Sequence, residues 1–302
     1  MGYSDWMDGA LGRSRCPACA RLDTRTTGLT TEGRYNLLDC GHCRSQFYVD
    51  VSGEPSDSDS HYKWESYKLD VYSDGAVRRG FESRYRYMID RARSEVGTLE
   101  SILDIGCGIG NFLEFAVSQG LEAVGSDVSA RAVAEARRRG LRVHLAEELG
   151  VSVSDDSFDA LTMWDVIEHV SEPKEMLASV VPKVRRGGAL LFETPDGGFP
   201  IRTLLLWLNK RTRGRVNLTG PMYYWEHKVY LTEDGIRALL DAVGVDIVHV
   251  ERQTSVRAKM QREFEVMRSK KGRVLKRAWP ALEAAFRRAG QGNKLLVVAR
   301  RR

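Results

Sequence analysis

The stretch Ser101-Ile-Leu-Asp-Ile-Gly-Cys-Gly-Ile-Gly110 decides the fold, because a short apolar strand runs directly into a glycine-rich turn. The glycines stand at every second position, Gly106, Gly108 and Gly110. They let the backbone turn sharply and approach a ligand closely. A helix predicted over 111–119 follows, and its amino terminus favours a carboxylate or a phosphate. The spacing is one residue shorter than the Gly-x-Gly-x-x-Gly of dinucleotide-binding domains, which argues against that class.

Downstream of this turn, short apolar strands alternate with amphipathic helices. Strands are predicted over 122–126, 141–145, 158–164, 189–193 and 292–299. Helices are predicted over 130–139, 173–184 and 232–243. This alternation is typical of an α/β fold with a doubly wound, mainly parallel sheet, here of seven strands. In such sheets ligands bind at the carboxyl ends of the strands.

Four of the five cysteines lie in the first 43 residues as two Cys-x-x-Cys pairs, Cys16 with Cys19 and Cys40 with Cys43. Two such pairs, about twenty residues apart, predict a small zinc ribbon with a hairpin over 26–38. Four thiolates fill the coordination shell of zinc, so the role is structural. The alternatives to a zinc site are a redox-active Cys-x-x-Cys pair and a chance cluster of cysteines.

The chain divides into three predicted parts: a zinc-binding module over 1–55, an aromatic-rich helical linker or lid over 56–95, and a core over 96–302. The aromatic side chains of the linker pack it onto the core or cover a site where tyrosines suit a sulfonium. The core contains a predicted lid over 197–230 and a basic helical insertion over 256–289.

Composition excludes several classes of protein. With 302 residues, 42% of them apolar and 29% charged, the chain can build a large core and is neither collagen-like nor wholly disordered. Its longest apolar runs fall far short of the roughly 20 residues of a membrane-spanning helix. The first residues lack the pattern of a signal peptide, so we expect a cytoplasmic protein.

The net charge of +5 is unevenly distributed, since residues 251–302 hold 16 Lys and Arg against four Asp and Glu. Such a segment attracts phosphates, nucleic acid or an anionic lipid surface, or forms the solvated face of a helix. The apolar stretch 199–215 has basic flanks and suits a lid, a phosphate site or a peripheral membrane contact.

Further motifs follow the glycine turn in a fixed order. Asp127 ends the next predicted strand, where an acid can accept both hydroxyls of a ribose, and Asp165 follows the strand over 158–164. With these motifs the sequence resembles the class I S-adenosylmethionine-dependent methyltransferases, nearest to the ubiquinone-type O-methyltransferases. The resemblance covers about residues 80–250 and the last strand.

This resemblance implies S-adenosylmethionine as the cofactor. It implies that the glycines shape the methionine pocket, that Asp127 binds the ribose, that Glu147 and Glu148 lie near the adenine, and that Asp165 lies near the reacting centre. The residues expected to bind the cofactor are Asp104, Gly106, Gly108, Gly110, Asp127, Val128, Glu147 and Asp165.

The candidate bases are His227 and, second, His169, which follows the strand over 158–164. The run Tyr224-x-Glu226-His227 is similar to the catalytic segment of sugar C-methyltransferases, which join a cysteine-rich zinc domain to this core. That likeness implies that Tyr224, Glu226 and His227 surround the acceptor and that His227 is the general base.

We therefore predict methyl transfer to a small polar metabolite, preferably a sugar or glycoside hydroxyl, with a sugar carbon or a nucleotide-linked sugar as variants. A zinc-ribbon RNA methyltransferase is one alternative. The motif Asn/Asp-Pro-Pro-Tyr/Phe of base amino methylation is absent, and Trp164-Asp-Val-Ile167 stands in its place. The other alternative is a catalytically silent cofactor-binding protein whose zinc module docks a partner.

Overall fold

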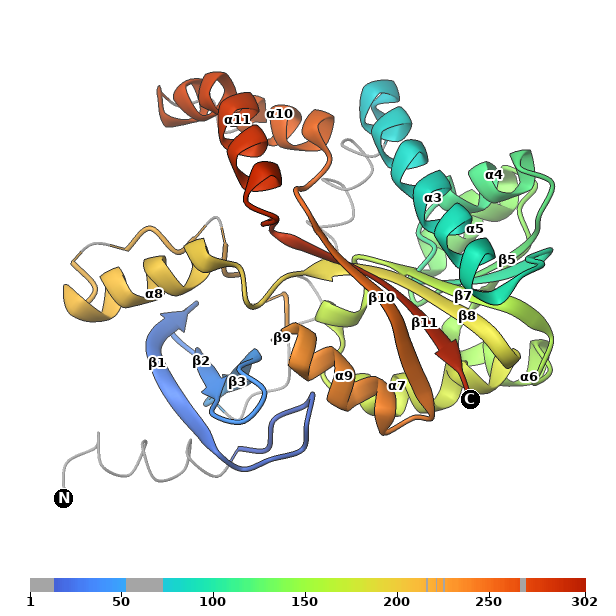
Figure 1. Cartoon of the computed structure of the whole chain (residues 1–302), viewed down its shortest axis with the longest axis horizontal. Helices are drawn as coiled ribbons and strands as arrows, with labels where there is room; N and C mark the ends of the chain where they lie inside the picture. The colour runs from blue at the N-terminus through green and yellow to red at the C-terminus, as the bar shows by residue number, and fades with distance from the viewer. Residues whose placement is uncertain (1–13, 53–72, 216, 221, 225, 267–269) are drawn as a thin grey trace.

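Two β-sheets organise the computed structural model (Figure 1). The larger sheet has the strand order β10-β11-β8-β7-β4-β5-β6, and the smaller one the order β1-β2-β3-β9. The structure describes residues 14–52, 73–215, 217–220, 222–224, 226–266 and 270–302.

The larger sheet is parallel from β8 to β6, and β11 runs antiparallel to both of its neighbours, β8 and β10. This arrangement confirms the predicted fold class. The strands are β4 (Ser101–Ile105), β5 (Glu122–Asp127), β6 (Val143–Leu145), β7 (Phe158–Trp164), β8 (Val184–Pro195), β10 (Val245–Gln253) and β11 (Lys294–Arg301).

Helices cover both faces of this sheet, as a doubly wound fold requires (Figure 1). One face packs against α3 (Gly75–Val96), α4 (Asn111–Ser118) and α5 (Ala130–Arg138). The opposite face packs against α6 (Leu149–Ser152), α7 (Pro173–Val180) and α9 (Glu233–Asp241).

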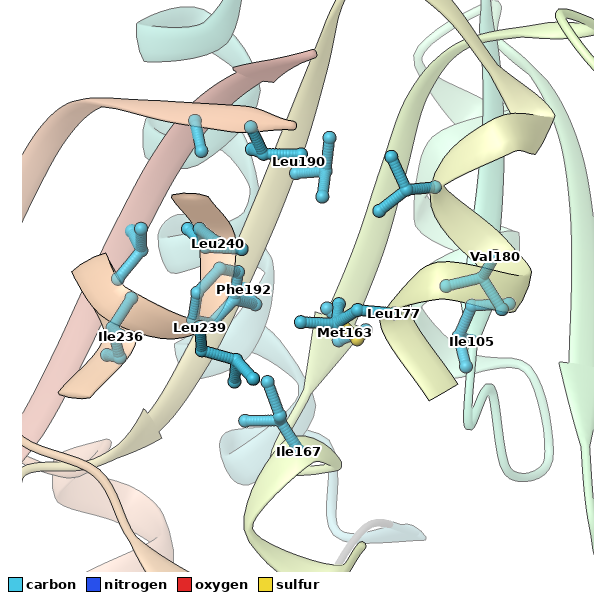
Figure 2. Close-up of a cluster of buried hydrophobic side chains, with 14 of the residues drawn as sticks. Ile105, Met163, Ile167, Leu177, Val180, Leu190, Phe192, Ile236, Leu239 and Leu240 are labelled. Carbon is cyan, nitrogen blue, oxygen red and sulfur yellow. The ribbon is translucent and has the colours of Figure 1, made fainter. Parts of the chain in front are cut away.

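Each central strand supplies both cores because successive side chains point to opposite faces. On β4, Leu103 and Ile105 join the core with α7 and α9, whereas Ile102 joins the core with α3 and α4. Figure 2 shows the first of these cores, where Met163 and Phe192 from neighbouring strands meet Leu239 of α9. Burying a side chain of this size stabilises the fold by about 1.5–3 kcal/mol.

The helix predicted over 173–184 is shorter in the structure, and this prediction was wrong at its carboxyl end. Helix α7 ends at Val180, the 3₁₀ turn η3 covers Val181–Lys183, and β8 begins at Val184. Pro182 is the physical reason, because a proline has no backbone N–H to donate within an α-helix and its ring clashes with the carbonyl four residues before it. Two other 3₁₀ turns are η1 (Ala146–Glu148) and η2 (Ile167–His169).

The smaller sheet combines the cysteine-rich segment with a piece of the core. Its strands are β1 (Thr24–Thr31), β2 (Tyr35–Cys40), β3 (Gln46–Asp50) and β9 (Val229–Tyr230). Helix α8 (Pro200–Arg211) lies beside β1 (Figure 1), and its Leu206 packs with Leu29 and Leu37 of the small sheet. Leu204 and Trp207 on the same helix are exposed. The assignment of 197–230 as a lid stays a prediction.

The predicted basic insertion forms two helices, α10 (Arg257–Val266) and α11 (Lys270–Arg288). They contact each other through the rings of Phe264 and Trp279, whose centroids are 5.8 Å apart. In Figure 1 both stand above the strand ends, near α3. Among the helices that the structure describes, none is both long and apolar enough to span a bilayer.

Candidate functional site

A cavity of about 1010 Å³ opens at the carboxyl end of β4, against the glycine turn that leads into α4. The turn needs glycine for two reasons. Gly106 and Gly110 have φ angles of +70° and +86°, a region that side chains with a Cβ rarely adopt. A Cβ on Gly110 would also lie 2.2 Å from Leu141 Cδ1. The local sequence therefore produces a tight loop that lines the cavity.

Asp127 stands at the end of β5 on the wall of this cavity. Its Oδ2 accepts a hydrogen bond from the Gly108 amide at 2.8 Å, and its Oδ1 accepts one from the Ser129 amide at 2.8 Å. Each carboxylate oxygen can accept a second hydrogen bond. A carboxylate held in this way suits the two neighbouring hydroxyls of a ribose.

Asp104 also lines the cavity, although only 1% of the residue is exposed. Its Oδ1 accepts a hydrogen bond from the Thr162 hydroxyl at 2.7 Å. The pKa of Asp104 is raised to about 8, mainly by burial and also by the nearby charge of Asp127, while the Thr162 hydrogen bond acts in the opposite direction. At neutral pH this carboxyl therefore carries a proton, which a bound cation would displace.

An aromatic wall faces these acids. Tyr85 of α3 contacts Trp164 and Phe112, with ring centroids 4.6 Å and 5.0 Å apart, and Phe81 stacks on Tyr85. All four rings line the cavity. The predicted aromatic linker thus both packs on the core and borders a site, at least over 75–96. The aromatics predicted at 62, 64, 67 and 72 lie outside the described residues. Acids opposite aromatic rings form a cavity suited to a cation that carries a flat ring.

Buried charges occupy one end of the cavity, at Asp165 and Glu193. Lys294 of β11 pairs with Asp165 and lies 3.8 Å from Glu193, and Arg84 of α3 pairs with Glu193 at 2.8 Å. Lys259 of α10 adds a second cation, 3.3 Å from Asp165. Asp165 has a φ of +55°, a left-handed conformation that aspartate tolerates and that often marks functional positions.

Two imidazoles meet close to this charged end. The ring centroids of His169, on η2, and His227 are 4.6 Å apart, and the Tyr224 ring lies 4.8 Å from His227. Nδ1 of His169 lies 2.9 Å from the carbonyl oxygen of Glu226. Burial, followed by the charges of His169 and Lys294, holds the pKa of His227 well below its usual range. His227 is therefore neutral at physiological pH and keeps a nitrogen lone pair.

The four cysteines of the two Cys-x-x-Cys pairs converge on one point beside the small sheet. Sγ of Cys16 lies 3.7 Å from Sγ of Cys43, and Sγ of Cys19 lies 3.5 Å from Sγ of Cys40. All four sulfur atoms lie within 4.8 Å of one another. Zinc–sulfur bonds of about 2.3 Å in a tetrahedron separate the sulfurs by about 3.8 Å. The geometry therefore fits a tetrahedral metal ion.

This cysteine cluster is joined to the segment that carries His227. Strand β3 pairs with β9, which begins two residues after His227. The Tyr48 amide donates to the Lys228 carbonyl at 2.9 Å, and the Tyr223 hydroxyl donates to Gln46 at 2.6 Å. The sheet that carries the cysteines is thus hydrogen-bonded on both sides of His227, to the segment that holds this residue.

The structure brings together most, but not all, of the residues predicted from sequence. Asp104, Gly106, Gly108, Asp127, Val128 and Asp165 line the cavity. In the part of the chain that the structure describes, Gly110 and Glu147 lie outside that lining, and Glu147 is exposed. The four predicted catalytic residues also lie outside this lining and cluster beside its charged end: Tyr224, Glu226, His227 and His169. The roles of all these residues stay predictions.

Sequence reasoning missed the buried cations and Glu193. Arg84, Glu193 and Lys294 come from three distant segments and meet only in the folded chain. One signal was available, because Glu193 and Lys294 are charged residues within or beside predicted strands that are otherwise apolar. Such residues are almost never buried unless paired.

Comparison with known families decides the class. A family model described as a methyltransferase domain matches residues 78–250. The chain belongs to this methyltransferase family. The match begins within α3 and ends within β10, so it includes all residues of the cavity lining except Ser73. It confirms the class that the ordered motifs predicted.

Curated relatives and solved structures agree with this assignment. The methyltransferase is 28% identical over 118 residues to "Ubiquinone biosynthesis O-methyltransferase" of Aliivibrio fischeri, and 32% identical over 118 residues to the protein of that name from Aromatoleum aromaticum. Each match covers 37% of this chain and 50% of the relative. The chain thus spans about half the length of the curated relatives it matches.

Among solved structures, a phosphoethanolamine N-methyltransferase 2 from Haemonchus contortus gives a TM-score of 0.56 at 16% identity. That match covers 85% of this chain and 62% of the other. At this identity the likeness shows the fold.

Proposed function

We propose that this methyltransferase transfers the methyl group of S-adenosylmethionine to a small polar metabolite, preferably to a hydroxyl of a sugar or glycoside. The observation that carries the proposal is the cavity between the glycine turn, Asp127 and the aromatic wall. Asp127 suits the ribose, the rings suit a sulfonium, and Asp104 suits the ammonium of the methionine part. A carbon of a sugar, as in the enzymes that the run Tyr224-x-Glu226-His227 resembles, is the second choice of acceptor atom.

Oxygen is preferred because the curated relatives are named O-methyltransferases. The reaction needs little covalent chemistry from the protein. The acceptor oxygen attacks the methyl carbon, the carbon–sulfur bond breaks, and its electron pair stays on sulfur as the neutral thioether of S-adenosylhomocysteine. Holding the two reactants in line can supply roughly 7–11 kcal/mol of the barrier.

The acceptor is expected at the charged end, where Asp165 and Glu193 close the cavity beside the histidine pair. Polar residues at this end suit a hydroxylated metabolite better than an apolar one. When no metal ion takes part, His227 is the proposed acceptor of the hydroxyl proton, because its ring is neutral.

We also propose that Cys16, Cys19, Cys40 and Cys43 bind a structural zinc ion. The support is the convergence of the four sulfurs and the absence of disulfides, since all five cysteines of the chain are free thiols. Free thiols in this number fit the reducing cytoplasm that the sequence predicts.

Isothermal titration of the full chain with S-adenosylhomocysteine tests the proposal. We expect saturable binding with one site per chain, and competition by S-adenosylmethionine. A panel of nucleotide-linked sugars and glycosides, incubated with S-adenosylmethionine and analysed by mass spectrometry, should then yield a product heavier by one methyl group. A chain that binds neither nucleoside would refute the proposal and favour a non-catalytic role.

A further inference from the structure

Three metal-ligating side chains outside the cysteine cluster converge from two segments. Glu168 and His169 lie on η2, and His227 lies just before β9. One ligand atom from each of the three lies within 4.8 Å of the others. The histidine rings are nearly perpendicular, with an interplanar angle of 86°. Two imidazoles and one carboxylate form a donor set that binds divalent first-row metals and leaves coordination positions open.

Two of these ligand atoms are buried and unused within the described chain. Glu168 is fully buried, and its Oε2 accepts a hydrogen bond from the Thr194 hydroxyl at 3.1 Å. Its Oε1 has no hydrogen-bond partner among the described residues, and neither has Nδ1 of His227. Leaving a buried hydrogen-bond acceptor unsatisfied destabilises the folded protein. A cation bound by these side chains would give such atoms the partner that they lack.

The carboxylate of Glu168 has weaker compensation than its acidic neighbours, because the cation that acts on it, Lys294, already pairs with Asp165. Asp165 pairs with Lys294 and Lys259, and Glu193 pairs with Arg84. None of the ion pairs found between described residues includes Glu168. A bound metal ion neutralises a buried carboxylate that has no ion-pair partner of this kind.

The third ligand is oriented by the main chain. Nδ1 of His169 lies 2.9 Å from the Glu226 carbonyl oxygen. A carbonyl oxygen can only accept, so Nδ1 carries the hydrogen and Nε2 is the ring nitrogen that can bind a metal ion. Carbonyl groups commonly orient metal-binding histidines in this way.

We propose that Glu168, His169 and His227 bind one divalent first-row metal ion, and that the ion holds the hydroxyl oxygen of the methyl acceptor. The second half of this inference rests on the proposed methyl transfer, whereas the first half does not. The site adjoins the reaction cavity through two segments. Asp165 lines the cavity three residues before Glu168, and Glu193 lines it directly before Thr194, which holds Glu168.

A metal ion here activates the hydroxyl and fixes its direction of attack. Coordination lowers the pKa of the hydroxyl, and the proton passes to water. The resulting oxygen forms the bond to the methyl carbon while the carbon–sulfur bond breaks toward sulfur. The metal ion occupies the nitrogen lone pair of His227 that would otherwise accept a proton. His227 is therefore either a metal ligand or a general base, but not both.

Titration of the full chain with Mn²⁺, followed by electron paramagnetic resonance, tests the site. Manganese is the suitable probe because carboxylate and imidazole bind it, whereas the cysteine thiolates select zinc. We expect loss of the free-ion signal with about one tight site per chain. The variants Glu168→Gln and His227→Ala should weaken Mn²⁺ binding at least tenfold, as losses around metal ligands do.

Glu172→Gln is the matched control. Glu172 is an exposed acid four residues further on, and its side chain makes no capping bond to α7. Its Mn²⁺ affinity should equal that of the unmodified chain, and the S-adenosylhomocysteine affinity of every variant should be unchanged, which shows that each is folded. Glu168→Gln keeps the size of the side chain, so it tests the site without opening a cavity.

The outcomes separate the two proposals. Equal Mn²⁺ affinity of Glu168→Gln and the unmodified chain, or no Mn²⁺ binding at all, overturns the metal site. Binding of Mn²⁺ without binding of S-adenosylhomocysteine supports the metal site and refutes the proposed methyl transfer. A tenfold loss that appears in Glu168→Gln but not in Glu172→Gln supports the site as described.

Discussion

Replacing Asp104 by asparagine should change how the stability of the protein depends on pH. Asp104 is buried beside the glycine turn, and burial raises its pKa to about 8, against an ordinary value of 3.8. Between these two values the folded protein holds a proton that the unfolded chain releases. The free energy of unfolding therefore falls as the pH rises through this window.

The size of the effect follows from the width of the window. One pH unit corresponds to 1.36 kcal/mol for a group that is protonated in one state and ionised in the other. From pH 5 to pH 7, both well inside the window, Asp104 alone lowers the stability by about 3 kcal/mol. Asparagine can still accept the hydrogen bond of Thr162, but it does not titrate, so the variant should lack this part of the slope.

Urea denaturation at pH 5, 6, 7 and 8, followed by far-ultraviolet circular dichroism, measures these slopes. The comparison is between slopes, because a buried amide can shift the absolute stability of the variant. The same exchange at the exposed Asp90 is the control, and its slope should match that of the unmodified protein. If the curves of Asp104→Asn and the unmodified chain run parallel from pH 5 to pH 7, Asp104 is ionised in the folded state and the reasoning is refuted.

Three further outcomes are expected. Gly110→Ala should lower the free energy of unfolding by roughly 2–4 kcal/mol in urea, because it combines left-handed strain with a Cβ placed 2.2 Å from Leu141 Cδ1. Gly108→Ala, where nothing lies within 4 Å, should lower it by only about 1–2 kcal/mol, and equal losses would contradict the steric argument. Asp127→Asn should weaken S-adenosylhomocysteine binding at least tenfold in calorimetry, since one carboxylate acceptor is lost; unchanged affinity would show that Asp127 does not hold the ribose. Cys16→Ser should release zinc and lower the melting temperature. It should also reduce turnover while S-adenosylhomocysteine still binds, because β3 pairs with β9 next to His227. Unchanged turnover in the metal-free variant would show that the cysteine module does not position the segment that carries His227.

The glycine turn, the alternation of strands and helices, and the cysteine pairs were readable from the sequence because each is a local pattern. A turn at positive φ depends on residues a few positions apart, and a strand is recognised from side chains that alternate between its two faces with a period of two. The acids at the strand ends could also be predicted, since parallel strands bring their carboxyl ends to one edge of the sheet. The end of α7 was misjudged because the helical pattern predicted over 173–184 continues past Pro182, whereas a proline interrupts the hydrogen bonding of an α-helix.

Only the tertiary structure placed Glu168 beside His227 and Lys294 beside Asp165. These residues are separated by 59 and 129 positions in the chain. Their meeting depends on the order of strands in the sheet and on the pairing of β3 with β9, which local sequence patterns do not encode. Burial, which sets the protonation of Asp104 and His227, likewise arises when distant segments exclude water from the same place. The sequence by itself determined the class of fold and the strand edge that carries the glycine turn. The packing of remote segments decided which charges and imidazoles meet at the charged end of the cavity.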